Sequence, residues 1–175
     1  LSDHDIELLA ESGASVVHCP VSNMRLGCGA SPVVKLLKAG VNVALGTDGA
    51  ASACSLSMFE QMRTAGLIAK GFSQDPTLLT VNQIIRMATI NGANALKLDR
   101  EVGSLAVGKF ADLAVIDMSQ LVTMPVLDVL SNVIYAVEAQ CIHQVWASGC
   151  LVANIQQEKL LRPDRGKLLT KSNIM

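Results

Sequence analysis

Three polar side chains, His18, Asn23 and Asp48, follow short apolar segments and could carry chemistry. Asp48 lies within Gly46–Gly49, directly after the apolar run Val41–Leu45. A short carboxylate at a strand exit can bind a metal ion or exchange a proton, and the neighbouring glycines leave room for a ligand. His18 ends an apolar run of its own and could face the same pocket, where Asn23 could orient a substrate.

Each of these residues also has a purely structural interpretation. Asp48 could cap a turn, because Thr-Asp-Gly is a common turn sequence, and Asn23 could close an Asx-turn. His18 could be a half-buried histidine bonded to a neighbouring backbone group. His4 and His143 do not share metal-ligand spacing with these residues. Because a zinc site needs at least three ligands within about 2–2.2 Å of the metal, we do not expect this chain alone to complete one.

The elements that would position these side chains alternate between helix and strand over residues 1–100. In chain order, the pattern predicts a helix from Ser2 to Gly13, a strand over 14–19, a loop over 20–30, a helix over 31–40, a strand over 41–45, an exit loop over 46–50, a helix over about 55–70, a helix capped by Thr80, and a short helix over about 91–97. Such alternation predicts a parallel sheet covered by helices. Ligands bind at the C-terminal ends of such strands, where His18 and Asp48 lie.

The character of the sequence changes near residue 100. A turn-rich stretch over 103–112 precedes an apolar strand over 113–116, and a helix is predicted over about 128–137. A hairpin follows, with strands over 142–147 and 151–153. We therefore expect residues 101–154 to form a small β unit, and residues 155–175 to form a loosely ordered tail.

Composition narrows the class of protein. The chain has 175 residues, of which half are apolar and only 3% are aromatic, and its net charge is −1. Balanced charge and scarce aromatics argue against nucleic-acid binding, and the apolar runs are too short to span a membrane. A small molecule is the expected partner. A mean hydropathy of +0.40 is high for a free-standing domain of this size, and the chain begins with Leu1, so we expect it to be a piece of a longer protein.

The cysteines indicate a reducing compartment. Their number is odd and no CxxC pair occurs, so neither a disulfide framework nor a zinc ribbon is indicated. We expect buried, reduced thiols and a cytoplasmic location. The five are Cys19, Cys28, Cys54, Cys141 and Cys150.

Four ordered blocks resemble the amidohydrolase superfamily. They are HCPVSN at 18–23, ASPVVKLLKAGVNVALGTDGAAS at 30–52, MATINGANAL at 87–96 and GSLAVGKFADLAVID at 103–117. The most similar branch holds 5′-methylthioadenosine/S-adenosylhomocysteine deaminases and related triazine chlorohydrolases. The resemblance implies the C-terminal part of a (β/α)8 TIM-type barrel, with strands 7 and 8 in residues 1–100, and part of a composite β-sandwich in residues 101–154.

The resemblance also implies a chemistry. In this superfamily the aspartate after the last barrel strand binds a catalytic divalent metal, usually zinc or alternatively iron, and shuttles protons; Asp48 matches it. His18 and Asn23 would line the pocket as supporting groups. The remaining metal ligands are expected upstream of Leu1. Ala53 and Cys54 stand where close deaminase relatives often carry two asparagines.

The expected function is hydrolytic deamination of adenine-type nucleosides, such as S-adenosylhomocysteine or 5′-methylthioadenosine, by a metal-activated water. The alternatives are a triazine chlorohydrolase, a guanine deaminase-like hydrolase, or a non-catalytic fragment that needs an N-terminal partner. We expect the 175-residue chain alone to be inactive, because the missing N-terminal barrel half would hold most of the ligands. The sequence leaves open whether the parent protein forms homo-oligomers.

Overall fold

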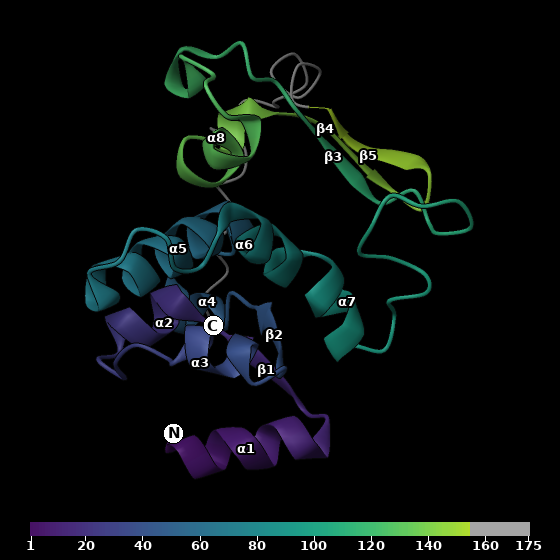
Figure 1. The fold of residues 1–175 in the computed structure, drawn as a ribbon. Helices are drawn as coiled ribbons and strands as arrows, with labels where there is room; N and C mark the ends of the chain where they lie inside the picture. Colours follow the sequence, from purple (N-terminus) through teal and green to yellow (C-terminus); the bar gives the residue numbers. More distant parts are fainter. Residues whose placement is uncertain (155–175) are drawn as a thin grey trace, which may run out of the picture.

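The computed structural model describes residues 1–154, so the predicted tail over 155–175 lies outside the described residues. The described part has a mixed α/β fold (Figure 1). In chain order its elements are α1 Asp3–Ser12, β1 Ser15–His18, α2 Pro20–Arg25, α3 Val33–Lys38, β2 Asn42–Leu45, α4 Ala50–Ala53, α5 Met58–Ser73, α6 Val81–Ala88, α7 Ile90–Ala95, β3 Leu113–Ile116, η1 Leu121–Thr123, α8 Val129–Tyr135, η2 Ala139–Cys141, β4 Ile142–Ala147 and β5 Cys150–Asn154.

The helix ends follow the capping signals in the sequence. Ser2 and Asp5 form a capping box at α1, in which the Ser2 backbone N–H donates to the Asp5 carboxylate at 2.7 Å. Gly13 ends this helix with a φ of 66°, a left-handed conformation that glycine adopts without strain. Thr80 and Gln83 form a second capping box at α6. These local signals confirm the predicted starts of both helices.

Two short helices near the strand exits are absent from the sequence prediction. The segment predicted as a loop over 20–30 begins with the helix α2, because Pro20 occupies the first helical turn and the Asn23 N–H donates to the Cys19 carbonyl at 3.0 Å. The predicted exit loop over 46–50 runs into a further short helix, α4. Helix α5 begins later than predicted, because Ser57 caps it by accepting from the Glu60 N–H.

Strands β1 and β2 form a parallel pair, as the alternation predicts. Their register joins Ser15 to Asn42 and His18 to Leu45, so both strands end at the same edge. Because side chains alternate along a strand, Val16 and His18 share one face of the pair, and Val17 points to the other. Val17 is 55% exposed, whereas His18 is 3% exposed.

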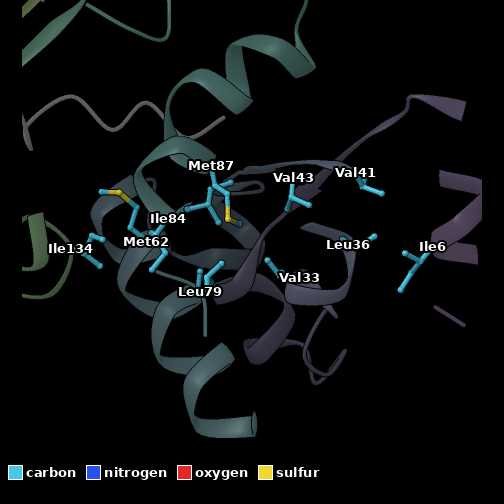
Figure 2. Close-up of a cluster of buried hydrophobic side chains, with 12 residues drawn as sticks. Ile6, Val33, Leu36, Val41, Val43, Met62, Leu79, Ile84, Met87 and Ile134 are labelled. Carbon is cyan, nitrogen blue, oxygen red and sulfur yellow. The ribbon is translucent and has the colours of Figure 1, made fainter. Parts of the chain in front are cut away.

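The main core lies on the His18 face of this strand pair. Val43 from β2 packs there with Met87 from α6, while Leu36 from α3 lies nearer Ile6 from α1 (Figure 2). Apolar side chains from five helices and β2 thus enclose one cluster, whose buried members are Ile6, Val33, Leu36, Val41, Val43, Leu45, Met62, Ala65, Leu79, Ile84, Met87 and Ile134. Burial of this kind stabilises the fold by about 25 cal/mol per Å² of apolar surface.

The second sheet is antiparallel, with strand order β3-β4-β5, and lies with α8 at one end of the molecule (Figure 1). The predicted strand over 113–116 and the predicted hairpin are confirmed, with Ser148 and Gly149 between β4 and β5. Helix α8 packs on α5 and α6 through the buried Ile134. Arg63 of α5 also donates to the Val137 carbonyl at 3.0 Å. None of the helices in the described residues has the length and apolar character needed to cross a membrane.

Candidate functional site

The exits of β1 and β2 lie side by side because the strands are parallel and in register. The Gly46 N–H donates to the His18 carbonyl at 2.9 Å, which extends the pairing one residue beyond β2. A Cβ atom on Gly46 would lie 2.7 Å from Val17 Cγ1 and 3.2 Å from Cys19 Sγ. The close approach of the two exits therefore requires glycine at this position, and it brings α2 next to the Asp48 segment.

Asp48 is exposed, and hydrogen bonds from different parts of the chain hold its carboxylate. The Gly49 N–H donates to Oδ1 at 2.7 Å, which is the local turn contact that the structural interpretation of Asp48 expects. The Ser22 hydroxyl donates to Oδ2 at 2.7 Å from 26 residues away. Asp48 has a φ of 59°, in the left-handed region where aspartate is enriched among non-glycine residues. The carboxylate is thus fixed in position while it remains open to solvent.

Ser22 also favours the ionised form of this carboxylate. The hydroxyl of Ser22 holds the pKa of Asp48 below its ordinary value, and the Gly49 N–H acts in the same direction, because both donate to the ionised form. Ser22 is 2% exposed, so its hydroxyl is aimed at Asp48 from a closed environment. The sequence analysis misses Ser22, because it predicts a loop over residues 20–30. Its place in the first turn after β1 is the signal that could have found it.

A hydrogen bond to Gln61 of α5 fixes the position of helix α2. The Val21 N–H donates to Gln61 Oε1 at 3.3 Å, and Gln61 is fully buried. Arg25 at the end of α2 donates to the carbonyls of Ala51 and Ser52 in α4, the latter at 3.1 Å. These contacts fix α2 between α5 and α4, so that Ser22 meets Asp48.

Asn23 lies next to Ser22, and its backbone groups form hydrogen bonds within this segment. Its N–H donates to the Cys19 carbonyl at 3.0 Å, and its own carbonyl accepts from the Cys28 N–H at 2.8 Å. The half-buried side chain of Asn23 stands one position from the residue that contacts Asp48. Its predicted role as a pocket-lining group stays a prediction.

His18 is brought to the same edge, but its side chain points toward the helices. Burial lowers the pKa of His18 to about 4, so the imidazole is neutral at pH 7. Its Nδ1 atom is buried and has no hydrogen-bond partner. His18 lines a cavity between α3 and α5, whereas the Asp48 carboxylate accepts hydrogen bonds from Ser22 and Gly49. His18 and Asp48 therefore lie at the same edge of the strand pair, but the His18 side chain is buried against the helices whereas the Asp48 carboxylate is open to solvent.

The cysteines are all free, but the expectation of buried thiols is wrong for three of them. Cys28, Cys54 and Cys150 are exposed, Cys19 is half-buried and Cys141 is buried. Burial raises the pKa of Cys19, and the nearby charge of Asp48 raises it further. A thiol of raised pKa is a poor nucleophile at neutral pH, so we do not expect Cys19 to act as a nucleophile.

A metal ligand set is not assembled within residues 1–154, where no group of three or more His, Cys, Asp or Glu side chains converges. His4 is exposed on α1, with Nδ1 3.7 Å from Glu7 Oε2, and His143 lies on β4 in the other sheet. Asp48 fits the role of one ligand, because its carboxylate is exposed, its pKa is held below the ordinary value, and a carboxylate can accept at about four lone-pair sites.

The arrangement defines an α/β protein with a fixed carboxylate at the exit of a parallel strand. The family model of the amidohydrolase family matches residues 1–152, and the chain belongs to that family. A curated 5-methylthioadenosine/S-adenosylhomocysteine deaminase of Moorella thermoacetica is 47% identical over 149 residues, which are 85% of this chain and 35% of the relative. A 5′-deoxyadenosine deaminase of Methanosarcina mazei is 40% identical over 172 residues, covering 98% of this chain and 39% of its own length.

A solved structure is also closely similar. An adenosine deaminase from Xanthomonas campestris, crystallised with bound zinc, matches with a TM-score of 0.88 and 43% sequence identity. The match covers 97% of this chain and 38% of that one. The chain therefore spans between a third and two fifths of the length of these relatives.

Proposed function

We propose that this chain is the C-terminal portion of a metal-dependent aminohydrolase that deaminates adenine-type nucleosides such as S-adenosylhomocysteine or 5′-methylthioadenosine. The observation that carries the proposal is the Asp48 carboxylate, ionised, exposed and oriented by Ser22 at the exit of a parallel strand. The names of the curated relatives support the substrate class, because they are deaminases of adenosine derivatives.

The proposal includes a finer assignment of the fold. Strands β1 and β2 are proposed as strands 7 and 8 of a (β/α)8 barrel, and β3, β4 and β5 as part of a composite β-sandwich. The parallel pairing of β1 with β2 supports this assignment. The exposure of Val17, on the face opposite the helices, supports it as well, since that face would point into the barrel. A complete barrel takes about 250 residues, which is more than this chain contains.

The metal site is proposed to be shared with residues upstream of Leu1. Asp48 would supply one oxygen ligand, and zinc is proposed because the similar adenosine deaminase contains it. A bound divalent metal supplies a water whose pKa falls to about 7, which makes it a nucleophile at neutral pH. The other contributions of this chain to the proposed reaction come from Asp48 and from the residues that hold its carboxylate.

Asp48 is proposed to move the proton. Its ionised Oδ atoms accept the proton of the attacking water and then deliver it toward the departing amine, so that ammonia leaves from C6 of the adenine ring. Ser22 favours the ionised carboxylate and fixes its orientation during this cycle. His18 would support the site through its carbonyl, which accepts from the Gly46 N–H, and Asn23 would line the pocket beside Ser22.

The test is an ammonia-release assay on the full-length protein that contains this chain. We expect turnover of S-adenosylhomocysteine and 5′-methylthioadenosine, with far lower activity on guanine and on chlorinated triazines. Absence of ammonia from both adenosine derivatives would overturn the substrate class, and activity on guanine or triazines instead would favour those alternatives.

The 175-residue chain alone provides the second arm. We expect neither stoichiometric metal nor turnover, because residues 1–154 offer one suitable ligand. Full activity of the isolated chain would contradict the shared metal site. If addition of a separate N-terminal half restores activity, the chain acts as a fragment that needs a partner, whereas a covalently continuous parent makes such addition unnecessary.

A further inference from the structure

Arg25, the last residue of α2, directs its charge at another helix. No ion pair within residues 1–154 includes Arg25. Its Nη1 atom instead donates to the carbonyls of Ala51 and Ser52, at 3.4 Å and 3.1 Å, and also contacts the Cys54 sulfur. Because all three acceptors belong to α4 or to the residue that ends it, the exposed guanidinium is held in a fixed orientation.

Helix α4 is too short to hold its own position. It has four residues, Ala50–Ala53, and no side chain caps its N-terminus. The last four carbonyls of a helix have no partner inside it, and in α4 these include the two that accept from Arg25. A basic side chain at this end also complements the helix dipole. We therefore expect the position of α4 to depend on Arg25, because isolated single turns of helix are unstable in water.

The other end of α4 is joined to the Asp48 carboxylate through Gly49. The Gly49 carbonyl accepts from the Ser52 N–H at 3.0 Å, and the Gly49 N–H donates to Asp48 Oδ1 at 2.7 Å. Ser52 is therefore bonded on both sides, through its N–H to Gly49 and through its carbonyl to Arg25. A displacement of Ser52 would reach Oδ1 of Asp48 through two hydrogen bonds.

Ser22 and Arg25 lie three residues apart on α2, a spacing that places two side chains on the same side of a helix. Helices α2 and α4 pack next to each other (Figure 1). Ser22 reaches Oδ2 of Asp48 directly, at 2.7 Å, whereas Arg25 reaches Oδ1 through α4 and Gly49. One helix therefore acts on both oxygens of the same carboxylate.

We propose that Arg25 is a positioning residue for Asp48, and that it fixes Oδ1 through α4 while Ser22 fixes Oδ2. This inference rests on the proposed function, in which Asp48 binds the metal and moves a proton. Arg25 forms no ion pair with the carboxylate, so its effect is on the position of Oδ1. Partners that orient a metal-binding side chain commonly contribute about 10–100-fold to metal affinity.

The test measures zinc affinity by competition with a chelator, and ammonia release, on the full-length protein that contains this chain. For Arg25→Met we expect the zinc dissociation constant to rise about tenfold and kcat to fall about tenfold, with KM nearly unchanged. Arg25→Lys should restore most of both, because an ammonium group also donates to carbonyls at the end of a helix. The matched control Arg100→Met, at an exposed position after α7, should behave as the native protein.

A double variant and urea unfolding distinguish positioning from stability. Ser22→Ala combined with Arg25→Met should bind zinc more weakly than either single variant, since neither oxygen of Asp48 is then held. Native zinc affinity and native kcat in folded Arg25→Met would overturn the proposal, whether or not its free energy of unfolding is lowered. The zinc measurement needs no substrate. If the zinc-loaded native protein releases no ammonia, the proposed substrate class fails, and zinc affinity alone decides the role of Arg25.

Discussion

Two polar residues end neighbouring parallel strands, and their surroundings are opposite. Asp48 is an exposed anion that accepts hydrogen bonds from Ser22 and Gly49. His18 is a neutral ring enclosed by helices, with a nitrogen that has no partner. Both have lowered pKa values, but hydrogen-bond donors cause the shift at Asp48 and desolvation causes it at His18. The comparison shows that a position at a strand exit does not by itself determine which pocket a side chain lines.

Side-chain alternation explains the difference. His18 is still within β1, so it follows the alternation of Val16 and points to the helix-covered face. Asp48 lies three residues beyond β2, in a turn with positive φ, where alternation no longer applies. The backbone of this turn, and not the strand, aims the carboxylate.

The largest expected effect comes from Asp48→Asn in the full-length protein. Because the amide can neither carry the charge nor accept the proton, we expect kcat to fall about a thousandfold or more. The matched control is Asp117→Asn, since Asp117 also follows a strand and hydrogen bonds from Ser119 lower its pKa to about 2. Steady-state kinetics should show near-native turnover for this control. Comparable losses in both variants would mean that a general loss of fold, and not proton transfer, explains the effect.

A smaller effect tests the close approach of the two exits. Gly46→Ala places a Cβ 2.7 Å from Val17 Cγ1, and we expect it to lower the free energy of unfolding by up to about 3 kcal/mol. Gly71→Ala is the control, because no atom lies within 4 Å of a Cβ at that helical position. Urea unfolding should show this control to be neutral or slightly stabilising. A neutral Gly46→Ala would contradict the packing of the two exits.

Acid should destabilise the fold through His18. The folded-state pKa of about 4 lies below the ordinary value of 6.5, so the unfolded chain binds more protons between these pH values. Stability is therefore retained above pH 6.5 and falls as the pH drops toward 4, by about 2 kcal/mol between pH 7 and pH 5. Urea unfolding of His18→Phe should lack this dependence, whereas the exposed control His4→Gln should keep it. Identical pH dependence in all three proteins would place His18 in contact with water.

The smallest effect concerns Ser22. Ser22→Ala removes the hydroxyl that lowers the pKa of Asp48, so that pKa rises. Because the ionised carboxylate is the active form, the acid limb of the kcat/KM profile should move to higher pH, with about a tenfold loss below it. Ser22→Thr keeps a hydroxyl and should restore the native limb. A merely structural role would lower activity equally at every pH and leave the limb in place.

The sequence predicted the parts of the fold that depend on local signals. The helix starts at Ser2 and Thr80 and the β4–β5 hairpin follow from patterns within a few residues, whereas the parallel strand pair follows from the helix–strand alternation over residues 1–100. The short helix α2 escaped prediction, because Pro20 reads equally well as the start of a loop or of a helix. The Ser22–Asp48 hydrogen bond could not be predicted, because it depends on how Gln61 of α5 positions helix α2.

The zinc content of the full-length protein tests the central contrast most directly. Metal analysis of purified native, Asp48→Ala and His18→Asn proteins should find near one zinc per chain in the native protein and in His18→Asn, and a strongly reduced amount in Asp48→Ala. This is the result expected if Asp48 belongs to the metal site and the His18 side chain belongs to the separate apolar cavity. Loss of zinc in His18→Asn together with full retention in Asp48→Ala would contradict the account.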